Sequence, residues 1–227
     1  MSKDRGIRIK SRQQFDNLID HLAAETRRAE EHWRLWGALN AATDYREEMH
    51  RTQHFWGLSM RAIQESAILR LARLFDSDTA ALSIHNFLTT IHRAAKRDQD
   101  PLGIVAAGLD TASLEVELTT VADTDPLVLD LKRIRNKYFA HRDADLVGRG
   151  TFHSLPKLRR EHIEQMLSRA SSITRKYCRL YERPIPSAPI GAEEDYKHLL
   201  KLLRLGLKSA NADPLGEVGQ PVELRQA

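Results

Sequence analysis

Apolar residues recur every three or four positions along almost the whole 227-residue chain, which is the period of an amphipathic α-helix. No segment shows the strict alternation of apolar and polar residues, closed by a turn, that indicates a strand. Short connections between long helical stripes are typical of antiparallel bundles. The sequence therefore predicts an all-α fold, an antiparallel helical bundle with long N-terminal helices and an extra C-terminal helix.

Capping residues mark where several of these helices begin. Ser11 precedes a stripe that continues to about residue 40, and a second stripe covers Trp56–Leu74. These two long stripes predict a helical hairpin that could also support dimerisation. Ser83 precedes a shorter stripe, and Asp125 followed by Pro126 is a typical N-cap and first helical residue.

The second half of the chain continues the pattern and then changes character. Helices are expected over Leu114–Val121 and through Ile163–Leu180, and an amphipathic helix over about residues 192–209. Between the last two, Pro184–Pro189 contains three prolines and predicts a linker. We therefore predict a bundle domain over residues 1–183, followed over residues 184–227 by the linker, the extra helix and a loose tail.

The composition excludes several classes of protein. With 41% hydrophobic residues the chain can bury a core, so general disorder is not expected. The single cysteine, Cys178, cannot close an internal disulfide, and no apolar run reaches the ~18 residues of a membrane span. The N-terminus is charged, unlike a signal peptide. These features predict a soluble, cytoplasmic protein with no membrane partner.

A polar cluster at the end of one helix is the strongest candidate for chemistry, because the sequence has no phosphate-binding glycine loop, no HExxH and no paired cysteines. It contains Arg135, Asn136 and His141. Histidine exchanges protons near neutral pH, and arginine presents a fixed fork to phosphate. RNA supplies its own nucleophile, the 2′-hydroxyl, so an arginine and a histidine could cleave it without a metal. Basic residues that flank this motif are the predicted contacts to the RNA backbone: Lys132, Arg133, Lys137 and Arg142.

The helix period limits how this motif can work. Six steps of about 100° place Arg135 and His141 roughly 120° apart around a straight helix. Either the helix ends or bends before His141, or a second subunit completes the site across a two-fold axis. A symmetric dimer would also supply two histidines, one as base and one as acid.

The motif and its setting resemble the HEPN superfamily, whose mark is an arginine, four to six residues and a histidine on a late helix of an all-α bundle. Arg135–His141 matches that pattern, including the polar residue after the arginine. The segments Ile68–Asp76 and Ala140–Asp143 are similar to the abortive-infection AbiU-like branch. The resemblance covers about residues 10–182.

This resemblance implies a HEPN-like bundle that acts as a dimeric, metal-independent endoribonuclease of a toxin–antitoxin or phage-defence system. Arg135 and His141 would be catalytic, Asn136 would support them, and no cofactor would be needed. The implied partners are RNA, a second copy of the chain, and an antitoxin or nucleotidyltransferase. Many toxin members carry a tyrosine two residues after the histidine, which such a transferase can modify. Here Asp143 stands at that position, which puts this route of silencing in doubt.

Other interpretations stay open at the level of sequence. His141 could be a satisfied histidine near a helix C-terminus, and Arg135 could pair with Asp76 or Asp130. The protein would then be a non-catalytic HEPN-type RNA-binding or protein-interaction module, or a purely structural dimerisation domain. His50 and His54 have a spacing that can hold zinc, but without a third ligand no metal site is predicted. Four basic residues on the last helix form either a solvated face or an RNA-tracking stripe: Lys197, Lys201, Arg204 and Lys208. The opposite, apolar face is expected to be buried: Tyr196, Leu199, Leu200, Leu203 and Leu207.

Overall fold

A computed structural model describes residues 7–78, 80–97, 100–136, 158–185 and 192–212. This part of the chain is helical and contains no strand, which confirms the predicted all-α class. Among its helices, none is both long enough and apolar enough to cross a membrane. The helices are α1 (Arg12–Ala41), α2 (Arg46–Arg51), α3 (Gln53–Leu74), α4 (Ile84–Ala95), α5 (Thr111–Val121), α6 (Pro126–Ile134), α8 (Arg160–Leu180) and α9 (Ala192–Ala212), with a 3-10 turn η1 (Thr43–Tyr45).

Side-chain caps fix the starts of three helices where the sequence predicts them. Ser11 Oγ accepts a hydrogen bond from the backbone N–H of Gln14 at 3.2 Å, and Ser83 Oγ caps α4 in the same way at 3.2 Å. Asp125 caps α6, whose first residue is Pro126. Each cap satisfies a backbone N–H that the helix leaves without a partner.

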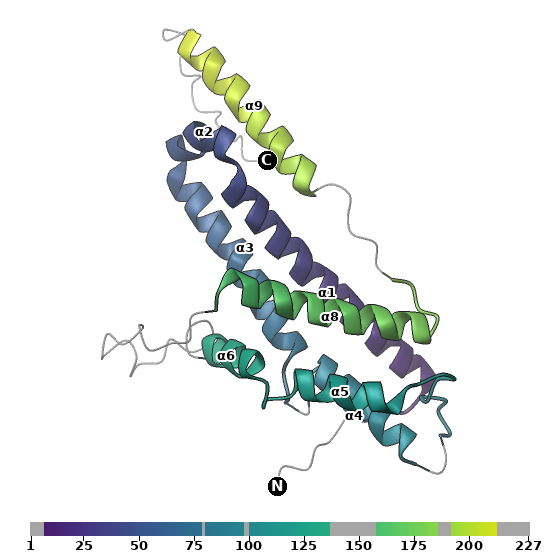
Figure 1. Ribbon diagram of the computed structural model, residues 1–227. Helices are drawn as coiled ribbons and strands as arrows, with labels where there is room; N and C mark the ends of the chain where they lie inside the picture. The colour runs from purple at the N-terminus through teal and green to yellow at the C-terminus, as the bar shows by residue number, and fades with distance from the viewer. Residues whose placement is uncertain (1–6, 79, 98–99, 137–157, 186–191, 213–227) are drawn as a thin grey trace, which may run out of the picture.

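Helices α1 and α3 form the long antiparallel hairpin that the sequence predicts, and α8 lies across α1 (Figure 1). At one end of the hairpin α4 packs against α5, and α6 contacts α3. The short helix α2 occupies the opposite end, where α9 joins it (Figure 1). The other helices therefore pack around the hairpin, and α6, which precedes the Arg135 motif, packs near the end of α3.

A continuous apolar core joins the hairpin to α4, α5, α6 and α8. Its aromatic centre is Phe15, whose ring stacks on Phe87 with centroids 5.5 Å apart and meets Tyr181 edge-on at 4.9 Å. Leu71 on α3 and Leu131 on α6 are completely buried in the same core. Burial of each such side chain contributes about 1.5–3 kcal/mol, so the core holds α6 firmly against the hairpin.

Helix α9 packs on a second, smaller core at the α2 end, and the orientation expected for it is wrong in part. Leu200 is fully buried there, but Leu199, which we placed on the same buried face, is 53% exposed. Arg204, placed on the solvated basic face, instead binds Glu48 of α2, and its guanidinium lies 4.3 Å from the ring centroid of Tyr45. The sequence did not reveal that α2 offers a buried carboxylate, and this carboxylate turns Arg204 inward.

Candidate functional site

The position of the motif is determined by how α6 is anchored at its start. Asp125 uses one carboxylate oxygen to cap α6, at 2.9 Å from the backbone nitrogen of Leu127. Its other oxygen accepts a hydrogen bond from Arg169 of α8 at 3.0 Å. Val128 and Leu131 then bury one face of the helix. Because the start and the buried face of α6 are both fixed, residues 132–136 have a defined position at the surface.

The α-helical part of α6 ends at Ile134, and Arg135 and Asn136 form a wider π-type turn. Arg135 keeps helical backbone angles (φ −52°, ψ −52°), so the chain widens here from the α-helical to the π-helical turn. Turns of this kind are frequent at functional sites. His141 and the residues between it and Asn136 lie outside the described part of the chain, so the choice between a bent helix and a second subunit stays a prediction.

Arg135 is held in place by two neighbours. Its Nη1 donates to Asp76, directly after α3, and its Nε donates to Asn136 Oδ1 at 2.9 Å. The side chains are only partly accessible, 21% for Arg135 and 17% for Asp76. These two bonds, through Nε and Nη1, fix the orientation of the guanidinium. Of the two acids that a purely structural role for Arg135 offered as partners, Asp76 is the one it binds, while Asp130 pairs with Arg133.

Lys132 lies beside Arg135 in a compact polar cluster with Ser77 and Asp123. Its Nζ is 2.7 Å from Asp123 Oδ1 and 2.6 Å from Ser77 Oγ, and Ser77 donates to Asp123 at 2.6 Å. Burial alone would raise the pKa of Asp123, but hydrogen bonds from Lys132 and Ser77 lower it more, so its pKa lies below the ordinary 3.8. Asp123 is therefore a carboxylate at neutral pH, and it binds Lys132.

Of the four residues predicted to contact RNA, the structure describes two. Lys132 is 16% exposed and engaged as above, whereas Arg133 is exposed and only loosely paired with Asp130 at 3.5 Å. Lys137 and Arg142, and the catalytic candidate His141, lie outside the described residues. The structure thus brings Arg135, Asn136 and Lys132 together and leaves the remainder of the site as a prediction.

Two members of this site, Ser77 and Asp123, were not identified from the sequence. They lie in connections after α3 and after α5, far apart along the chain. The only sequence signal was a polar stretch after each apolar stripe, which is equally typical of any loop. Their meeting depends on how α3, α5 and α6 pack, and helix periods do not contain that information.

Neither a metal site nor a reactive thiol is found in the described residues. No three histidine, cysteine or carboxylate side chains gather there as a metal ion would require. His50 and His54 belong to different helices, since α2 ends at Arg51 and α3 begins at Gln53. Cys178 is buried, and burial raises the pKa of its thiol, so it acts as a packing residue.

Comparison with known proteins gives one result. A family model named HEPN AbiU2, with the description AbiU2, matches residues 12–199. The match begins with α1, includes the Arg135 motif and ends within α9. Neither the curated proteins nor the solved structures gave a match.

Proposed function

The chain belongs to the AbiU2 family of HEPN proteins, and from this membership we propose that it is a metal-independent endoribonuclease of a toxin–antitoxin or phage-defence system. The observation that carries the proposal is the fixed guanidinium of Arg135. Arg135 directly follows α6 in a π-type turn, with Asp76 and Asn136 bonded to Nη1 and Nε. A preorganised cation of this kind stabilises the charge that develops on a phosphate during cleavage.

In the proposed reaction His141 removes the proton from the RNA 2′-hydroxyl. The 2′-oxygen attacks the adjacent phosphorus, the bond to the 5′-oxygen breaks, and a 2′,3′-cyclic phosphate and a 5′-hydroxyl end result. Arg135 neutralises the additional charge on the non-bridging oxygens. The leaving 5′-oxygen takes its proton from a second acid, which in a symmetric dimer is His141 of the other subunit.

We assign the residues around Arg135 different roles in this reaction. Asp76 is a positioning residue, because it acts on the guanidinium and not on RNA. Asn136 positions Nε from the other side. Arg133 is exposed next to the site and is the better RNA-backbone contact, whereas Lys132 neutralises Asp123 and so keeps a carboxylate from repelling phosphate.

Purified wild-type protein is expected to degrade RNA in the presence of EDTA. His141→Ala and Arg135→Ala should each abolish cleavage without unfolding the protein, and Arg133→Ala should only weaken it. Because Arg133 is a neighbouring arginine on the same helix, it is a matched control for loss of one positive charge. Cleavage that persists in His141→Ala would refute the site assignment.

One observation favours an alternative, a non-catalytic RNA-binding or protein-interaction module. The ion pair from Arg135 to Asp76 ties α6 to the end of α3, and that contact would stabilise a bundle with no active site. This alternative predicts RNA binding that weakens with salt, no cleavage in EDTA, and loss of stability as the main effect of Arg135→Ala.

A further inference from the structure

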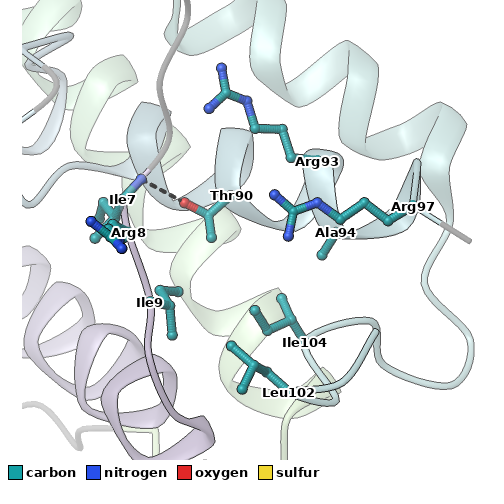
Figure 2. A pocket seen from close by; sticks show the side chains of 9 residues that line it. All are labelled: Ile7, Arg8, Ile9, Thr90, Arg93, Ala94, Arg97, Leu102 and Ile104. Carbon is teal, nitrogen blue, oxygen red and sulfur yellow. Dashed lines mark hydrogen bonds between the residues drawn. The ribbon is translucent and has the colours of Figure 1, made fainter. Parts of the chain in front are cut away.

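A cavity of about 430 Å³ lies at the C-terminal end of α4, apart from the Arg135 motif. Three arginines line it: Arg8 from the segment before α1, Arg93 from the last turn of α4, and Arg97 from the residues that follow α4. In Figure 2 the side chains of Arg93 and Arg97 lie on one side of Thr90 and that of Arg8 lies beside Ile7 on the other, while Ile9, Leu102 and Ile104 lie in the lower half of the view. The cavity therefore has a cationic side and an aliphatic side.

The cationic side has no counter-charge in the described part of the chain. No carboxylate lines the cavity, and within the described residues none of the three arginines forms an ion pair. A concave surface lined by charges of one sign concentrates anions from solution. Guanidinium groups in particular present paired N–H donors that match the oxygens of phosphate.

The walls of the cavity are fixed, so it does not depend on a ligand to form. On one side the backbone N–H of Ile7 donates to Thr90 Oγ1 at 2.9 Å, which ties the segment before α1 to α4. On the other, Tyr181 Oη donates to the carbonyl of Ile104 at 2.6 Å. Arg12 Nη1 donates to the carbonyl of Gly103 at 2.5 Å.

Gly103 has φ +59°, a conformation that favours glycine, and this fixes the turn that carries Leu102 and Ile104. The volume lies in the range of small-molecule sites, and such sites are usually preformed.

We propose that this cavity binds a small organic phosphate, with the phosphate on Arg93, Arg97 and Arg8 and an apolar or planar moiety on Ile9, Leu102 and Ile104. Inorganic phosphate alone would leave the aliphatic side empty. An extended RNA strand would need an open groove and aromatic stacking surfaces, and no aromatic residue lines this cavity. The proposal does not depend on ribonuclease activity, because none of these residues belongs to the Arg135 motif.

The test is calorimetric titration of the full chain at about 0.15 M salt, where weak surface attraction is screened. Two probes distinguish the possible organic moieties: ATP offers a planar base and geranyl diphosphate an aliphatic tail. Pyrophosphate reports the phosphate contacts alone, and a single-stranded RNA with a 5′-hydroxyl reports general backbone binding. At least one organic probe should bind saturably, and at least about tenfold more tightly than pyrophosphate or RNA.

The double substitution Arg93→Gln, Arg97→Gln should weaken that binding at least about tenfold, because two charge-assisted contacts are lost. Arg46→Gln, Arg61→Gln removes the same charge elsewhere and should leave binding unchanged. Thermal melting checks that both variants are folded. The proposal is overturned if no organic probe saturates, if pyrophosphate or RNA binds equally well, or if both double variants lose affinity to the same extent.

Discussion

Replacing Asp76 with asparagine tests whether the ion pair beneath the motif positions Arg135. Asp76 Oδ2 accepts from Arg135 Nη1, and Asp76 Oδ1 accepts from the backbone N–H of Asp78 at 3.1 Å. Asparagine has the same shape and keeps one carbonyl oxygen for Asp78. The substitution therefore removes the negative charge opposite Arg135, together with a longer contact of 4.0 Å to Lys132 Nζ.

The cost follows from the limited exposure of the pair. With 17% and 21% of the two side chains accessible, Arg135 would keep a partly desolvated charge without its partner. A hydrogen bond to a charged group contributes about 1.5–3 kcal/mol to the free energy of unfolding. For a domain of this length the melting temperature should fall by roughly 3–10 °C.

A double-mutant cycle isolates the pair from the other effects of each substitution. Urea unfolding of wild type, Asp76→Asn, Arg135→Gln and the double variant should give a coupling free energy of about 1–2 kcal/mol. The matched cycle on Asp130 and Arg133, which are 35% and 55% exposed and 3.5 Å apart, should give ~0.5 kcal/mol or less.

The rate of RNA cleavage tests whether the contact between Asp76 and Arg135 also matters for activity. Asp76→Asn should lower the cleavage rate at least about tenfold at saturating RNA, because the guanidinium loses its orientation while RNA binding elsewhere persists. The reasoning is refuted if the two cycles give equal coupling, or if Asp76→Asn cleaves RNA at the wild-type rate.

Three further predictions concern stability and toxicity. The hydrogen bond from Arg204 lowers the pKa of Glu48 below its ordinary 4.5. The ion pair therefore contributes to stability at neutral pH, and this contribution is lost as the pH falls through the lowered pKa. Glu48→Gln should destabilise the protein at pH 7, and denaturation curves should show a smaller difference from wild type toward pH 3. Leu71→Ala, at a fully buried position, should cost about 2–5 kcal/mol by urea unfolding, whereas Leu58→Ala at a 68% exposed position should stay within about 0.5 kcal/mol. Expression of the wild-type chain in bacteria should arrest growth and that of His141→Ala should not; equal toxicity of the two would count against a catalytic role.

The sequence predicted the helices well because their signals are local. Ser83 and Asp125 cap helices by accepting hydrogen bonds from residues two or three positions later in the chain. Contacts between such near neighbours can be recognised from the sequence. The apolar stripes likewise identify α1 and α3, since one helix face must be buried in any bundle. These features explain why fold class and hairpin were predictable.

The candidate site was predictable only where one segment carries it. Arg135 and Asn136 are neighbours, so the motif identified both, and the pairing with Asp76 was one of two options considered. Ser77 and Asp123 could not be found, because they reach Lys132 from connections 55 and 9 residues away. The prediction for Leu199 was wrong for a related reason: the rotation of α9 about its axis depends on its contacts with α1 and α2, which the period of its own residues does not contain.

The most direct test of the proposed reaction is the chemistry of the RNA ends that the purified protein leaves in EDTA. Attack by the 2′-hydroxyl predicts 2′,3′-cyclic phosphate and 5′-hydroxyl ends, which are absent with Arg135→Ala. Products with 5′-phosphate and 3′-hydroxyl ends, or no cleavage by the wild-type protein, would contradict the account.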